Sequence, residues 1–116
     1  MRVLEWNIEH ALFKHERELK SILSKNKVDL AILTETDGEN IRGNFNLPGF
    51  KTFYPVPPIK TTNSKPEKIR IICLARDGPD ISFEMRLDMM SRDTPMIWIE
   101  ARTHTGMKFL IGGVVL

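Results

Sequence analysis

The chain lacks several features that mark specialised classes of protein. It has one cysteine among 116 residues, so no disulfide can form within a single chain. Cys73 lies in the apolar segment IRIICLA, and we expect it to be a buried structural thiol rather than a nucleophile. No apolar run approaches the roughly 20 residues of a membrane-spanning helix. The amino-terminal segment also lacks the apolar core of a signal peptide, which favours a cytoplasmic or nuclear protein.

A strong net charge is missing too. The 17 Lys and Arg residues nearly balance the 15 Asp and Glu residues, so the formal net charge is only +2. No global field therefore marks the chain as a nucleic-acid binder, and a site for a polyanion would have to be local. The composition, 41% hydrophobic and 28% charged, is typical of a globular chain, and the length predicts a single domain over residues 1–116.

The first third of the sequence predicts a strand, a helix and a second strand. The segment RVLEWNI, residues 2–8, has the β-branched and aromatic content of a strand. VDLAILT, residues 28–34, is the nearly continuous apolar run of a strand covered on both faces. The segment between them predicts an amphipathic helix of about four turns that ends near Asn26. The apolar residues that recur at helical spacing are Leu12, Leu19, Ile22 and Leu23. This order predicts a βαβ unit with parallel neighbouring strands.

The remainder predicts a long loop followed by strands. Residues 38–66 are rich in Gly, Pro and Asn and read as a loop excursion, broken by a short strand at FKTFYP, residues 50–55. Strand-like runs separated by turn residues then predict an antiparallel meander over four segments: 68–77, 81–89, 95–103 and 108–116. The expected fold class is α/β, a βαβ unit followed by this meander. Trp6 and Trp98 are expected in the core.

The candidate site lies where the first two strands end. The carboxyl ends of parallel strands meet at one edge of a sheet, and ligands of α/β proteins bind outside that edge. Asn7 and Glu35 both fall there, and Asp37 would share the face of Glu35 if the chain stayed extended. Glu5 and Glu9 would lie on the side of Asn7. Mg²⁺ takes one or two carboxylates and leaves its other positions to water and phosphate, so this set suits phosphoryl chemistry.

A simpler interpretation competes with this one. Glu35 and Asp37 can be the first solvated residues after a buried strand, and Asp37 can cap a turn. Spacing alone favours that interpretation. Asn7 is harder to explain in this way, because asparagine is depleted in strands and a buried amide needs hydrogen-bond partners.

The order of RVLEWNIEH, an amphipathic helix and VDLAILTET resembles the start of the endonuclease/exonuclease/phosphatase superfamily, which has the deoxyribonuclease-I-like fold. Later segments, LPGFKTFYP and IWIEART…KFLIGGVV, are similar to parts of the same family, so the resemblance covers the whole chain. It implies one half of a four-layer α/β/β/α sandwich. It also implies that Asn7 contacts the metal shell or the scissile phosphate, and that Glu35 ligates Mg²⁺ or Mn²⁺.

Other motifs of the family are missing. Neither its Asp-x-Asn middle motif nor its closing motif with the catalytic histidine is present, and His10, His15 and His104 read as surface residues. The resemblance therefore implies the amino-terminal fragment of a divalent-metal-dependent phosphodiesterase. The expected activity is that of an endonuclease hydrolysing nucleic acid or another phosphodiester, inactive alone because the general base would lie beyond Leu116.

A fragment of this kind is expected to expose apolar surface. The sequence stops inside an apolar strand, which predicts either a piece of a longer protein or a half-domain that needs a partner. We expect self-association through an inner sheet face that has lost its partner sheet. That face would include Val3, Ile32, Ile71, Ile97, Ile99 and Ile111.

The alternative function is a half-domain that binds nucleic acid or phosphate and assembles with itself without turnover. Basic residues on and after the long loop are candidate contacts to a nucleic-acid backbone: Lys51, Lys60, Lys65, Lys68 and Arg70. A solvated basic loop is the simpler interpretation of each. Phe50, Phe53 and Tyr54 are able to stack on bases, although packing of the loop onto the domain is the commoner fate.

Overall fold

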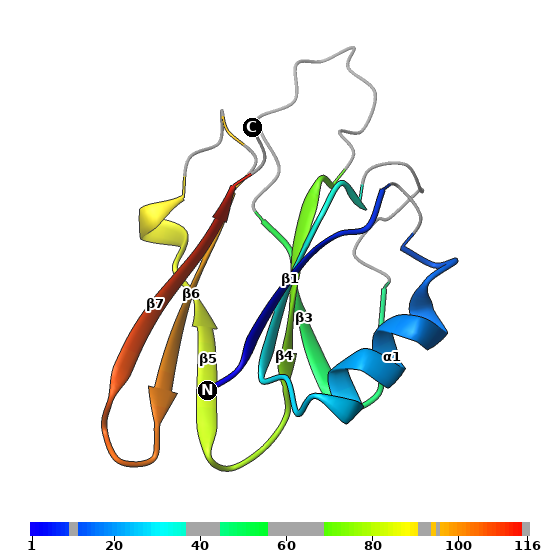
Figure 1. The fold of residues 1–116 in the computed structure, drawn as a ribbon. Coiled ribbons are helices and arrows are strands. Elements are labelled where there is room, and N and C mark those ends of the chain that lie inside the picture. The colour runs from blue at the N-terminus through cyan, green and yellow to red at the C-terminus, as the bar shows by residue number, and fades with distance from the viewer. Residues whose placement is uncertain (10–11, 37–44, 56–68, 91–93, 95, 115–116) are drawn as a thin grey trace.

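The computed structural model describes residues 1–9, 12–36, 45–55, 69–90, 94 and 96–114. Within these ranges a helix, a four-stranded sheet and a three-stranded sheet are stacked as three layers (Figure 1). The α/β fold class is confirmed. None of the helices in these ranges is both long enough and apolar enough to cross a membrane.

The four-stranded sheet, here called the first sheet, contains the βαβ unit that the sequence predicts. Its strands, in spatial order, are β1 (Val3–Asn7), β2 (Leu30–Thr34), β4 (Ile71–Arg76) and β3 (Phe50–Phe53). β1 and β2 are parallel, and helix α1 (Glu16–Lys25) connects them. β4 pairs antiparallel with both β2 and β3.

The three-stranded sheet, here called the second sheet, is an antiparallel meander. Its strands are β5 (Ile81–Met85), β6 (Met96–Thr103) and β7 (Lys108–Val114), and the short helix η2 (Leu87–Met89) follows β5. The prediction that residues 68–77 open this meander is wrong, because β4 lies in the first sheet. β4 is almost wholly buried, with side chains packed on both faces, and a central position in a sheet satisfies that pattern.

Helix α1 is shorter than its sequence pattern predicts. It has 10 residues, about three turns, and Leu12 is buried before the helix begins. Asn26 follows the last helical residue, as expected. Lys27 adopts a left-handed conformation with φ +50°, and Val28 N donates to Leu23 O at 3.0 Å. This is the usual left-handed helix end, with a lysine in place of the common glycine.

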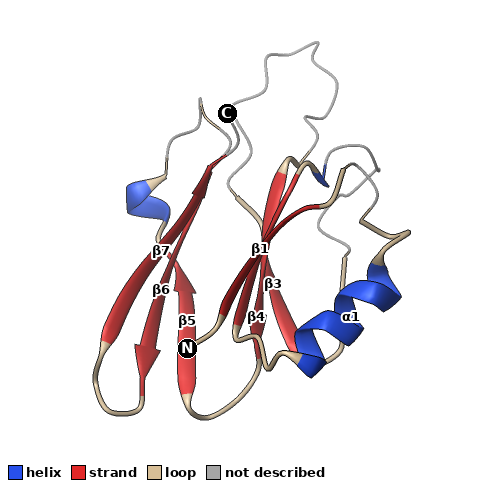
Figure 2. Ribbon diagram, in the orientation of Figure 1, coloured by secondary structure: helices blue, strands red, loops and turns tan. Residues whose placement is uncertain are grey.

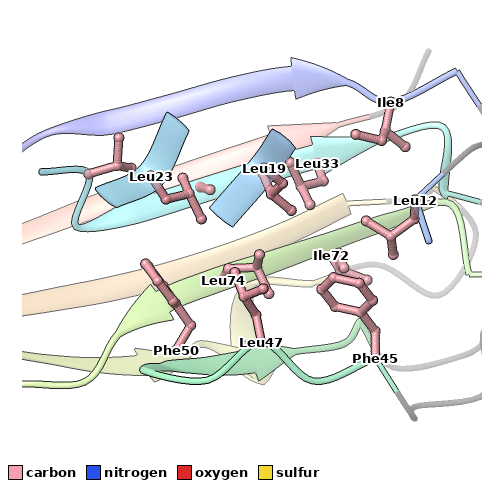
Figure 3. Packing of buried hydrophobic residues seen from close by; sticks show 12 residues of the cluster. Ile8, Leu12, Leu19, Leu23, Leu33, Phe45, Leu47, Phe50, Ile72 and Leu74 are labelled. Atoms are coloured by element: carbon pink, nitrogen blue, oxygen red, sulfur yellow. The ribbon is translucent and has the colours of Figure 1, made fainter. Parts of the chain in front are cut away.

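Figure 2 shows the helix and the strands of the two sheets in different colours, and two apolar clusters hold these layers together. The first fills the space between α1 and the first sheet, where Leu19 and Leu23 of the helix meet Leu33, Ile72 and other buried residues (Figure 3). The second lies between the two sheets and consists of Leu30, Ile32, Phe53, Ile71, Cys73, Ala75, Ile97 and Ile99. Burial of Phe50, Phe53 and Cys73 confirms their expected packing roles.

The expectation of an inner face without a partner sheet is wrong. Ile32, Ile71, Ile97 and Ile99 are buried because the second sheet covers the first. Ile111 is half-buried at this interface, and Val3 stays 45% exposed at the edge. Among the described residues, most of the apolar surface of this face is therefore already buried between the two sheets.

Two consecutive glycines of β7 allow close contacts on both faces of the strand, one glycine on each face. A Cβ atom on Gly113 would lie 2.8 Å from Ile32 Cγ2 and 3.0 Å from Ile71 Cδ1, so the missing side chain lets the sheets approach. A Cβ on Gly112 would lie 2.7 Å from the Trp98 ring. Trp98 therefore covers Gly112 on the outer face of the second sheet and is half-buried. Trp6 is also half-buried and packs against the cluster between α1 and the first sheet, in line with its expected place in the core, whereas Trp98 belongs to neither apolar cluster.

Candidate site at the carboxyl ends of β1 and β2

The parallel register brings the two predicted site residues to the same sheet edge. Asn7 is opposite Thr34, the residue before Glu35, and Ile8 N donates to Thr34 O at 3.0 Å. The first two strands therefore end side by side, as the βαβ pattern predicts. Asn7 is exposed and Glu35 is half-buried at this edge.

The side chain of Asn7 is held by the backbone that follows it. Its Oδ1 accepts a hydrogen bond from Glu9 N at 3.0 Å, and Glu9 is left-handed with φ +53°. This Asx turn ends β1. Because the amide oxygen is engaged with the backbone, the amide nitrogen is directed away from it and can donate to a ligand oxygen. Leu4 and Trp6 pack toward α1, so Asn7 faces the opposite side of the first sheet.

Glu35 also departs from extended backbone. Its φ is +54°, which costs roughly 1–2 kcal/mol for a residue with a side chain. The next residue, Thr36, is buried, and its Oγ1 donates to Ile69 O at 2.6 Å. The left-handed turn removes the basis for expecting Glu35 and Asp37 on one face, and Asp37 itself lies outside the described residues.

The described residues at this edge offer few metal ligands. In the ranges that the structure describes, no group of three or more His, Cys, Asp and Glu side chains is arranged to hold a metal. A closed site of the zinc type is therefore not formed by these residues. Mg²⁺ usually takes one or two protein carboxylates and completes its shell with water and phosphate. Glu35 would supply one such carboxylate, and β1 ends at Asn7 on the neighbouring strand.

The two candidate nucleic-acid contacts that the structure describes, Lys51 and Arg70, lie apart. Arg70 is half-buried at the same edge as Asn7, where its carbonyl accepts from Thr36 N at 3.4 Å. Lys51 pairs with Ala75 toward the other end of β4, about 16 Å away along the strand. Lys60, Lys65 and Lys68 lie outside the described residues.

Lys51 borders a depression of about 170 Å³ beside the β4–β5 connection. Its Nζ lies 4.8 Å from the centroid of the Phe53 ring. Arg76 also lines the depression, but its guanidinium donates to Val28 O and Leu23 O, each at 2.8 Å. Arg76 therefore caps the end of α1 and is not available there as an anion ligand.

Sequence reasoning missed a charged cluster on the outer face of the second sheet. Glu100 is 8% exposed and accepts from Arg102 Nε at 2.8 Å and from Arg86 Nη1 at 3.1 Å. The hydrogen bond from Arg102, with smaller contributions from nearby cations, lowers the pKa of Glu100. Arg86 also pairs with Asp88 at 2.7 Å. The usable signal was the i, i+2 spacing of Glu100 and Arg102, which places both side chains on one face of a strand.

The described histidines do not lie at the Asn7–Glu35 edge as general bases. His15 is half-buried, its Nδ1 is 3.1 Å from Glu18 Oε2, and its ring centroid lies 5.6 Å from that of Trp6. Trp6 packs on the α1 side of the first sheet, opposite to Asn7. His104 is exposed in the turn after β6, as expected. His10 lies outside the described residues.

A scan against protein-family models finds no family that matches this chain, and a search of curated proteins finds no matching relative.

Proposed function

We propose that this chain supplies the metal-binding and phosphate-binding half of a divalent-metal-dependent phosphodiesterase, an endonuclease that hydrolyses nucleic acid. The observation that supports the proposal most directly is the parallel register of β1 and β2, which sets Asn7 beside the end of β2 that carries Glu35. The single buried thiol, Cys73, fits a reducing compartment, so we place the activity in the cytoplasm or nucleus.

Each residue has a distinct role in the proposed site. Glu35 holds Mg²⁺ or Mn²⁺ through its carboxylate. An ion held there would supply Lewis-acid stabilisation of the phosphate and activation of water. Asn7 donates from its amide nitrogen to a non-bridging phosphate oxygen, because its amide oxygen is fixed by Glu9 N. The Asx turn thus leaves the amide nitrogen of Asn7 able to donate at the edge where Glu35 would hold the cation.

Little or no turnover is expected from residues 1–116 alone. Hydrolysis by an activated water needs a general base within hydrogen-bond reach. His15 is engaged with Glu18 on the α1 side of the first sheet, and His104 lies in the turn after β6. Neither described histidine is placed to take a proton from water at Asn7.

Calorimetric titration with Mn²⁺ tests the metal site. We expect weak binding by the chain and a loss of at least tenfold in affinity in Glu35→Gln. Glu5→Gln is the matched control, because Glu5 is an exposed carboxylate on the same face of β1 as Asn7. That variant should bind like the parent chain. Equal binding by all three proteins would contradict the assignment of Glu35.

An assay on plasmid DNA and on a chromogenic phosphodiester tests the expected lack of turnover. Strong hydrolysis that persists in Glu35→Gln would refute the proposed role.

The presence of Arg70 at the same edge favours a second candidate, a non-catalytic phosphate-binding half-domain. Oligonucleotide binding that is unchanged by a chelator and weakened by Arg70→Gln would support this second function instead.

A further inference from the structure

Strand β7 ends the second sheet and leaves one side of its backbone without a neighbouring strand among the described residues. The sheet order is β5-β6-β7, and β7 lies at the outer left of the molecule in Figure 1. Thr103 N donates to Met107 O, so the carbonyl of Met107 points toward β6. Arg86 N donates to Trp98 O, so the carbonyl of Trp98 points toward β5 and not toward Gly112 of β7. Backbone groups alternate sides along a strand, so alternate residues of β7 direct N–H and C=O away from β6. These residues are Lys108, Leu110, Gly112 and Val114.

The edge of β7 is the least protected of the sheet edges in the described chain. Edge strands are usually blunted by short length, proline or a central charge. β1 carries Glu5 at its centre, β5 carries Glu84, and β3 has four residues that include Lys51. β7 has seven residues, no proline, and a single charge at its first position, Lys108.

The order of large and small residues in β7 is complementary to itself. When two copies run antiparallel about Ile111, Leu110 of each copy is opposite Gly112 of the other. Phe109 is likewise opposite Gly113. Phe109 and Leu110 are 37% and 47% exposed, so each has apolar surface to bury in such a pair. The two Lys108 side chains lie at opposite ends of this pairing and do not repel each other.

We propose that β7 is a self-recognition edge, through which two copies of this chain join their second sheets into one continuous six-stranded sheet about a twofold axis at Ile111. Trp98 covers Gly112 on the outer face, so Leu110 of the second copy packs against the edge of that indole ring. The outward N–H and C=O groups of Leu110 and Gly112 pair across the axis. This interface is isologous, and it closes after two copies.

Sedimentation velocity tests the proposed dimer. The parent chain should sediment at twice its mass of 13.4 kDa at micromolar concentration. Leu110→Lys places a charge beside the axis, and at least a tenfold weaker association is expected. Leu87→Lys is the control, because Leu87 is 55% exposed on η2 and outside β7. A parent chain that stays monomeric, or equal weakening by both variants, would overturn the proposal.

Oxidative cross-linking tests the register. In the proposed pairing the two copies of residue 111 are directly opposite, within disulfide reach, whereas the two copies of residue 109 are about 13 Å apart along the strands. Ile111→Cys should therefore give a covalent dimer, and Phe109→Cys should not. Burial raises the pKa of the native Cys73 thiol to about 12, so the parent chain should not cross-link. Equal yields from both variants would show unspecific association and contradict the register.

Discussion

Three described residues other than glycine adopt left-handed backbone, and two of them follow the adjacent strands β1 and β2. Glu9 has φ +53° and Glu35 has φ +54°, whereas Lys27 ends α1. Strained residues of this kind persist where the surrounding structure fixes them, and they concentrate at functional sites. The paired occurrence at one sheet edge is therefore consistent with the site proposed there.

Glycine at position 9 should stabilise the fold. Glu9→Gly removes the steric cost of the left-handed conformation, and we expect the free energy of unfolding to rise by about 0.5–1 kcal/mol. Glu5→Gly, in the extended part of β1, should lower it by about the same amount. Urea denaturation measures both changes. Destabilisation by Glu9→Gly would show that its backbone carries no such strain.

A methyl group at position 113 should destabilise the contact between the sheets. Its Cβ would lie 2.8 Å from Ile32 and 3.0 Å from Ile71, and a crowded core pays about 1–3 kcal/mol for such an insertion. Gly78→Ala is the matched control, because no atom lies within 4 Å of its added Cβ. Thermal unfolding should separate the two variants, and similar melting temperatures would argue against close packing at Gly113.

At the scale of elements, Arg76 links the end of β4 to the end of α1. Its guanidinium donates to Leu23 O and Val28 O and lies 4.9 Å above the Phe50 ring. Hydrogen bonds from a charged donor contribute about 1.5–3 kcal/mol. Arg76→Met, which keeps much of the apolar stem, should lower the free energy of unfolding by about that amount. Arg76→Lys should recover little, because an ammonium group lacks the planar fork. If Arg76→Lys kept the full free energy of unfolding, the positive charge at position 76 would explain the stabilisation without the two hydrogen bonds.

The outer face of the second sheet predicts a pH dependence. The hydrogen bond from Arg102 lowers the pKa of Glu100 in the folded chain, and Arg86 lowers that of Asp88. A lowered carboxyl pKa stabilises the fold above the ordinary carboxyl range and loses that effect as the pH falls through the lowered value. Melting temperature should therefore fall as the pH drops below about 5. Glu100→Gln should melt lower at neutral pH and show a flatter profile. An unchanged profile would exclude Glu100 as a source of the pH dependence.

The sequence predicted local elements better than their long-range partners. Apolar periodicity located α1 and the strands of the βαβ unit, because these patterns depend on burial within one segment. The sequence pattern assigned β4 to the wrong sheet. The turn residues 77–80 have the same composition whether the chain makes a hairpin or passes to another sheet. Asn7 and Glu35 were placed together by parallel pairing. Nothing in the sequence predicts the left-handed backbone of Glu35, because glycine, and not glutamate, is the residue that usually marks such a turn.

At the scale of the whole molecule, the layers explain which surfaces are closed and which are open. The first sheet is covered by α1 on one face and by the second sheet on the other (Figure 1). Most of the apolar surface between the sheets is therefore buried, whereas the edge of β7 stays open as the place where we expect a second copy to fit. The proposed metal site lies at a different edge, so loss of the dimer and loss of metal binding should be separable by mutation.

The most direct test of the account is paramagnetic broadening of backbone amide resonances by Mn²⁺. Substoichiometric Mn²⁺ should broaden the amides of Asn7 and Glu35 first and leave those near Lys51 sharp, and Glu35→Gln should abolish the effect. Broadening that is centred elsewhere, or that survives Glu35→Gln, would contradict a cation site at the shared carboxyl edge of β1 and β2.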